Sequence, residues 1–138
     1  MKLIAAAIVY VIAFCFLTGC KKESTKISLQ QKLIGKWSMK MAIGSYTVQG
    51  NKRSDTTRFT ADDFIDLKAN GTLSISEANI IYTGMWNIID GKLHIARTGY
   101  MDYANGFDIP VVETNRLQLY YTETNAASLL EQKLNLGK

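Results

Sequence analysis

Residues 63–98 read DFIDLKANGTLSISEANIIYTGMWNIIDGKLHIART and carry the clearest strand and turn signals of the chain. It contains short runs of alternating apolar and polar residues, with Asn70-Gly71 and Asp90-Gly91 between two pairs of them. Alternation with a period of two predicts a strand with one buried face. Asn-Gly and Asp-Gly favour two-residue hairpin turns, because these residues tolerate a positive φ. The stretch therefore predicts antiparallel strands over 63–69, 72–77, 80–89 and 92–98.

The flanking sequence continues this pattern in both directions. On the N-terminal side, the alternation that begins at Trp37 predicts a strand over 35–43, and weaker patterns predict strands over 45–49 and 56–60, with a polar turn over 50–55. On the C-terminal side, residues 107–113 and 116–123 predict a last hairpin. About eight short strands joined by tight turns are typical of an antiparallel sandwich or barrel. Closing the sheet on itself would hide its edges.

Two helical segments are expected at the ends of this all-β region. Residues 29–34 predict a short helical turn, with Ser28 as its N-cap and Gly35 as its end. Residues 126–134 predict a C-terminal helix, because Leu130 and Leu134 lie four positions apart and would share one helical face.

Length and composition exclude several classes of function. The 138 residues, 47% of them hydrophobic, are typical of one globular domain. The formal net charge of +4 is too small for a nucleic-acid-binding protein. One histidine and two cysteines leave little for a metal site, and no nucleophile, phosphate-loop or zinc motif is present. We therefore expect no enzymatic activity, no cofactor, no metal and no nucleic-acid partner.

The N-terminus carries a leader. Fifteen consecutive apolar residues follow Lys2, which is the pattern of a secretory signal. The run then ends in Leu17-Thr18-Gly19-Cys20, which resembles the lipobox of bacterial lipoproteins. The resemblance implies a signal peptide over 1–19, acylation of Cys20 with chains such as palmitate, a lipidated tether over 20–28 and a domain over 29–138. A transmembrane helix and an ordinary secretory signal are the two alternatives.

A lipidated cysteine defines the expected location. The resemblance implies a bacterial cell-envelope protein held on a membrane by its lipid, with the outer membrane favoured over the inner one. The domain would be periplasmic or surface-exposed. Two or three acyl chains anchor a protein firmly, since each buried methylene contributes about 0.8 kcal/mol.

The order of several short pieces resembles a known family. Gly35-Lys36-Trp37, the stretches 63–73, 84–88 and 90–95, and the closing run 116–121 together resemble the lipocalin-like lipoproteins of Bacteroidetes-type bacteria. The resemblance implies an eight-stranded antiparallel up-and-down barrel. It also implies a basic residue packed over Trp37, for which Arg116 is the nearest candidate.

Two functions follow from such a barrel, and both stay open at this point. An eight-stranded barrel has room for its own side chains or for one small ligand. Alternation places these candidate ligand-binding residues on its inner face: Trp37, Met39, Met41, Tyr82, Trp86, Ile95, Leu119 and Tyr121. The first function is therefore binding of a small hydrophobic ligand. The second is a filled scaffold, interaction module or inhibitor that contacts an envelope protein through the aromatic loop at 100–107.

Overall fold

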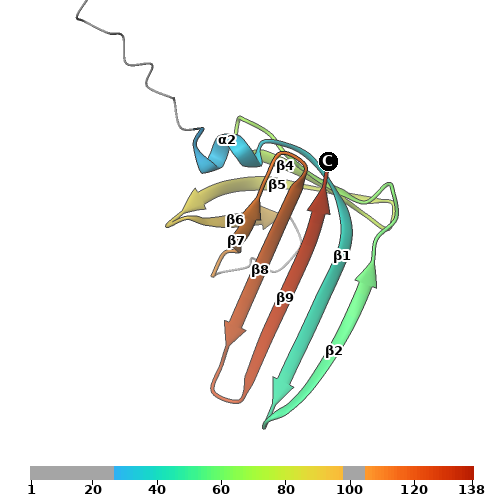
Figure 1. Cartoon of the computed structure of the whole chain (residues 1–138), viewed down its shortest axis with the longest axis vertical. Coiled ribbons are helices and arrows are strands. Elements are labelled where there is room, and N and C mark those ends of the chain that lie inside the picture. Colours follow the sequence, from blue (N-terminus) through green and yellow to red (C-terminus); the bar gives the residue numbers. More distant parts are fainter. Residues whose placement is uncertain (1–26, 98–104) are drawn as a thin grey trace, which may run out of the picture.

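The computed structural model describes residues 27–97 and 105–138, and this part of the chain is almost entirely β-structure (Figure 1). The predicted signal peptide and Cys20 lie outside the described residues. The elements are α2 (Leu29–Leu33), β1 (Gly35–Val48), β2 (Asn51–Arg58), β3 (Phe64–Leu67), β4 (Thr72–Glu77), β5 (Ile80–Ile89), β6 (Lys92–Arg97), β7 (Asp108–Val112), β8 (Arg116–Thr124) and β9 (Ser128–Gly137). None of the described helical residues forms a segment long and apolar enough to span a bilayer.

The strands form a nearly closed antiparallel barrel. Their order is β6-β5-β4-β3-β1-β9-β8-β7, with β2 paired to β1. Strand β3 pairs with the first residues of β1, from Gly35 to Ser38, and β2 pairs with the later ones, from Met41 to Val48. Strands β2 and β3 therefore share one position in the sheet. Counted together they give eight positions in chain order, which confirms the expected up-and-down barrel.

The barrel has one weak seam in the described residues. Between β6 and β7, the pairing is a single bridge between Leu93 and Phe107, with N–H to O=C distances of 2.9 and 2.8 Å. Most of the loop between these strands lies outside the described residues. The barrel is thus continuous everywhere except along this seam.

The prediction of a C-terminal helix over 126–134 is wrong, because residues 128–134 belong to β9 and residues 126 and 127 lie in the turn before it. Strand β9 lies between β1 and β8 and pairs with both of them. Leu130 and Leu134 are four residues apart, an even number, so a strand also puts them on one face. The free edges of β1 and β8 provide backbone partners along the whole segment, and this tertiary pairing overrides the local helical preference.

The short N-terminal helix is present as α2 and covers one end of the barrel (Figure 1). Ser28 and Gln31 form a capping box, in which each side chain accepts a hydrogen bond from the other residue's backbone N–H. Leu33, the last residue of α2, is fully buried in the barrel core. We call this end of the barrel the α2 end.

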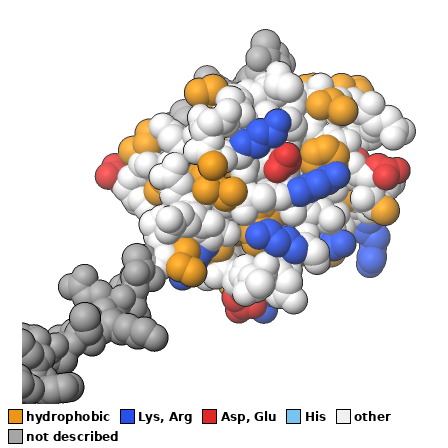
Figure 2. Space-filling view, turned by 90° about the horizontal axis from the view of Figure 1, so that it is seen from above, with side chains coloured by type: hydrophobic (Ala, Val, Ile, Leu, Met, Phe, Trp, Pro, Cys, Tyr) orange, Lys and Arg blue, Asp and Glu red, His pale blue; other side chains and the backbone are white. Residues whose placement is uncertain are grey.

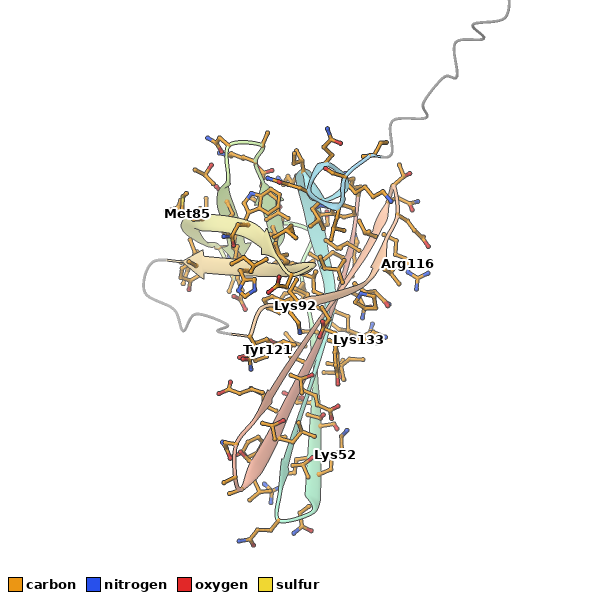
Figure 3. The ribbon with its side chains drawn as sticks, turned by 90° about the vertical axis from the view of Figure 1, so that its left-hand side faces the viewer. Lys52, Met85, Lys92, Arg116, Tyr121 and Lys133 are labelled. Atoms are coloured by element: carbon orange, nitrogen blue, oxygen red, sulfur yellow. The ribbon has the colours of Figure 1, made fainter. Side chains whose placement is uncertain are left out.

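At the opposite end, four strands continue beyond the barrel as a sheet (Figures 1 and 3). This extension consists of the later residues of β1, the whole of β2, the end of β8 and the start of β9. The prediction of a polar turn over 50–55 is wrong, since the turn is Gln49-Gly50 and β2 begins at Asn51. All eight residues of β2 are exposed, so β2 lacks the apolar alternation that would have marked it as a strand.

A β-bulge in β1 separates the barrel from the extension. The register with β9 shifts between Met39 and Met41, so Lys40 is an extra residue in β1. An extra residue reverses the side to which the following side chains point. Accordingly Met39 and Ala42 are buried, whereas Met41 is only half-buried.

Candidate functional site

The α2 end of the barrel interior is filled by its own side chains. Trp37, Leu67, Leu73, Leu93 and Leu117 are each at most 2% exposed. The indole N–H of Trp37 donates to the carbonyl oxygen of Leu33 at 2.7 Å. A second indole N–H, from Trp86, donates to the carbonyl oxygen of Lys68 at 2.9 Å. Trp37 therefore links α2 to the core, and Trp86 links the turn after β3 to the core.

The basic residue over Trp37 is Lys138 and not Arg116. The Nζ atom of Lys138 lies 4.2 Å from the centre of a Trp37 ring, whereas the Arg116 side chain is exposed. The same ammonium lies 3.5 Å from the carbonyl oxygen of Ile34. Arg116 pairs in register with Gly137, the residue before Lys138. The predicted residue therefore lies on β8, next to the strand that leads to Lys138.

A cavity of about 80 Å³ lies in the part of the interior that adjoins the extension. Its lining is apolar apart from one carboxylate and one carboxamide. The lining residues are Met39, Ala42, Phe59, Ile65, Ile75, Glu77, Ile95, Phe107, Leu119, Gln132 and Leu134. A cavity needs about 10–15 Å³ to hold one water molecule, and an apolar cavity of about 150 Å³ holds benzene. The cavity therefore has room for several water molecules or for an apolar group smaller than a benzene ring.

The structure places only some of the predicted ligand-binding residues at this cavity. Met39, Ile95 and Leu119 line it. Trp37, Trp86 and Tyr121 are buried in the surrounding core, and Tyr82 packs against that core while half-buried. Met41 does not line the cavity, because the bulge makes Ala42, and not Met41, the next residue after Met39 that points inward.

Several lining residues were missed at the level of sequence. Gln132 and Leu134 were assigned to a helix, and Phe59 lies in the corner between β2 and β3. Phe107 was expected in a surface loop, but it is 4% exposed and its ring centre lies 5.6 Å from that of Tyr121. The other aromatic residues of that loop, Tyr100 and Tyr103, lie outside the described residues. The alternation of β4 already contained the signal for Ile75.

A buried carboxylate holds the corner beside the cavity. Asp63 is 4% exposed and accepts hydrogen bonds from the Thr60 N–H at 2.7 Å, the Thr60 hydroxyl at 2.9 Å and the Ala78 N–H at 2.9 Å. The hydrogen bonds from Thr60, with that from Ala78, lower the pKa of Asp63. Asp63 thus ties the β2–β3 corner, which carries Phe59, to the β4–β5 turn.

A second carboxylate joins the four strands of the extension on its outer face. Glu131 of β9 accepts hydrogen bonds from the hydroxyls of Tyr120 in β8 (2.6 Å) and Ser45 in β1 (3.0 Å). It also forms an ion pair with Lys52 in β2 (2.9 Å). The bond from Tyr120, followed by those from Lys52 and Ser45, lowers the pKa of Glu131 to about 2. One side chain from each strand therefore meets at a single ionised carboxylate.

This network makes stability depend on pH in a defined direction. The pKa of Glu131 is lower in the folded chain than its usual 4.5, so the stabilisation is complete above about pH 4.5 and is lost as the pH falls towards 2. Urea unfolding of the wild type and of Glu131→Gln across this range measures the effect. We expect the wild type to be more stable above pH 4.5 and the gap to shrink towards pH 2. A gap that stays constant would contradict this assignment.

Two other features bear on function. Strand β5 exposes apolar side chains on one face, where Ile81, Met85 and Ile89 are 67%, 58% and 47% exposed (Figure 3). Within residues 27–97 and 105–138, no three His, Cys, Asp or Glu side chains are grouped so that they could hold a metal ion.

Comparisons of the chain with protein-family models, with curated proteins and with solved structures find no match. Function is therefore inferred from the barrel, its cavity and the lipobox-like residues 17–20.

Proposed function

We propose that this chain is a lipid-anchored cell-envelope protein whose lipocalin-like barrel binds a small hydrophobic group. The observation that carries the proposal is the apolar cavity of about 80 Å³ between the packed α2 end and the extension. The lipobox-like residues Leu17 to Cys20 support the anchor. No part of this function needs a catalytic group or a cofactor.

The volume of the cavity limits what can enter it. A whole drug-sized molecule needs a pocket of about 300–1,000 Å³. The cavity fits one apolar end of a ligand, such as a few methylene or methyl groups. The carboxylate of Glu77 and the carboxamide of Gln132 belong to the same lining, so a polar part of the ligand would meet them.

Filling the cavity is expected to abolish binding. Ala42 is 8% exposed and lines the cavity, so Ala42→Leu would place extra methyl groups inside it. With 1-hexanol as the probe, the methyl NMR signals of Ile75, Ile95 and Leu119 should shift saturably in the wild type and not in Ala42→Leu. The matched control is Ile81→Leu on the exposed face of β5, which should bind like the wild type. Equal shifts in the wild type and in Ala42→Leu would reject this cavity as the binding site.

The alternative function is an interaction module with a filled barrel. The exposed stripe of Ile81, Met85 and Ile89 on β5 favours it, because apolar side chains that share one exposed face are typical of protein contacts. Native mass spectrometry of the protein from its own host separates the two functions. A bound small molecule supports ligand binding, whereas a bound protein crosslinked through β5 supports the interaction module.

A further inference from the structure

The charges of the described residues are unevenly divided between the two ends of the molecule. The α2 end comprises α2, the first residues of β1, the turns after β3, β5 and β7, and the end of β9. It carries six cations: Lys32, Lys36, Lys40, Lys68, Arg116 and Lys138. The carboxylates at this end are Asp66, Asp90 and Glu113, whereas the other described residues hold six cations and seven carboxylates. The positive charge is therefore concentrated at the α2 end.

The cations of α2, β1, β8 and β9 lie on neighbouring elements at this end. Gly137 of β9 pairs with Ser38 of β1 on one side and with Arg116 of β8 on the other. The cations of these three strands therefore lie side by side at this end. The ammonium groups of Lys36 and Lys138 lie over the rings of Phe64 and Trp37, at 3.8 and 4.2 Å from the ring centres. All six residues are exposed, and neither ion pair of the described part, Lys52–Glu131 or Lys92–Asp108, includes any of them.

Figure 2 looks directly onto this end of the molecule. Blue Lys and Arg side chains gather over the middle of the face with a red carboxylate between them, and the other red side chains lie towards the rim. We call this surface, formed by the six cations, the basic face.

The chain enters the barrel at the same end. Ile27, the first described residue, is 62% exposed and directly precedes Ser28, the N-cap of α2. The 26 residues before it include Cys20. A tether from Cys20 to Ser28 spans at most about 3.3–3.6 Å per residue. A lipid on Cys20 would therefore hold the α2 end, and not the extension, close to the bilayer.

We propose that the basic face docks on the anionic phospholipid head groups of the bilayer that holds the chain. This proposal rests on the lipid anchor of the proposed function. Cations near an anionic membrane surface are attracted to it, and the attraction falls off within a Debye length of about 8 Å at physiological salt. This attraction therefore acts only on a face that a short tether keeps near the membrane surface. Docking would direct the extension and the adjoining cavity away from the membrane.

Two single-cysteine variants of the acylated full chain test this orientation. Ala69→Cys places a fluorescent label beside Lys68, and Asn51→Cys places one in the extension; both positions are exposed. Head-group nitroxide lipids in vesicles of phosphatidylcholine, with or without phosphatidylglycerol, then quench any label near the surface. We expect phosphatidylglycerol to increase quenching at position 69 and to leave position 51 unquenched.

Paired charge reversals identify the residues responsible. Lys68→Glu with Arg116→Glu should remove the effect of phosphatidylglycerol at position 69. The matched control, Arg53→Glu with Arg58→Glu, makes the same change of charge on β2 and should keep the effect. Quenching at position 69 that ignores phosphatidylglycerol, stronger quenching at position 51, or equal loss in both pairs would overturn the proposal.

Failure of the anchor would be recognised separately. The intact mass of the purified chain reports acylation at Cys20. A chain without acyl groups would reject the anchor, but its co-sedimentation with phosphatidylglycerol vesicles would still test the basic face. Removing each cation of that face should then lower the affinity by about fivefold. An affinity unchanged by the Lys68 and Arg116 reversals would overturn docking in that case as well.

Discussion

Trp37→Ala is expected to lower the free energy of unfolding by about 3–5 kcal/mol, which is the usual cost of truncating a fully buried tryptophan. Trp37 is 0% exposed and belongs to the core at the α2 end. Its removal would leave a cavity there, and it would also leave the carbonyl oxygen of Leu33 without the indole donor. Urea unfolding followed by circular dichroism measures the loss.

The Trp37→Phe variant separates packing from hydrogen bonding. It keeps an aromatic ring in the core but removes the N–H that donates to Leu33. Leaving a buried acceptor unsatisfied costs about 1–3 kcal/mol, so this variant should be less destabilised than Trp37→Ala. A loss below about 1 kcal/mol for Trp37→Ala would show that Trp37 does not close the α2 end as described.

Lys133→Pro is expected to destabilise the chain by more than about 3 kcal/mol, although the Lys133 side chain is exposed. Lys133 lies in the middle of β9 and pairs with Ile43 of β1 and Tyr120 of β8. A proline has no N–H, and a strand between two partners cannot accommodate it without losing ladder hydrogen bonds. The same urea unfolding experiment, together with the cooperativity of thermal unfolding, measures the effect.

The control for this variant is Lys133→Ala, which keeps the backbone N–H. It should change the free energy of unfolding by less than about 0.5 kcal/mol, because the position has no buried side chain to lose. A proline variant as stable as the alanine variant would mean that β9 does not close the barrel in solution.

The local turn signals predicted the hairpins well, because a turn depends mainly on its own residues. Asp90 and Gly91 both have positive φ, at 51° and 77°, and join β5 to β6 as a two-residue turn. At Asn70-Gly71 only Gly71 has positive φ, and the loop contains four residues, with the Gly71 N–H donating to the Lys68 carbonyl oxygen. The strands on each side still pair as expected.

Elements whose own residues carry no clear strand pattern were predicted less well. The β9 segment satisfies a helical and a strand pattern equally, and only the presence of β1 and β8 on its two sides decides between them. Strand β2 has no apolar alternation at all, and its pairing with β1 makes it a strand. The β1–β9 hydrogen bonds join residues far apart in the sequence, whereas β2 pairs with β1 across the short turn Gln49-Gly50.

The same reason limits the prediction of the candidate site. Alternation predicted that Met39, Ile95 and Leu119 face the barrel interior, and all three line the cavity. Alternation also predicted that Met41 faces the interior, which is wrong, because no residue near Lys40 is typical of a β-bulge. It also missed Gln132 and Leu134, since the element that carries them was assigned to the wrong class.

The bulge at Lys40 has a consequence for insertions and deletions in the gene. Loss of one codon there would remove the bulge and leave a regular ladder, with Met39 opposite Leu136 and Met41 opposite Asn135. Ala42 would still point inward, and Ser45 would keep its place opposite Glu131. Loss or gain of one residue elsewhere in β1 would instead exchange the two sides of the strand beyond it, so the length of β1 is less constrained at Lys40 than at the neighbouring positions.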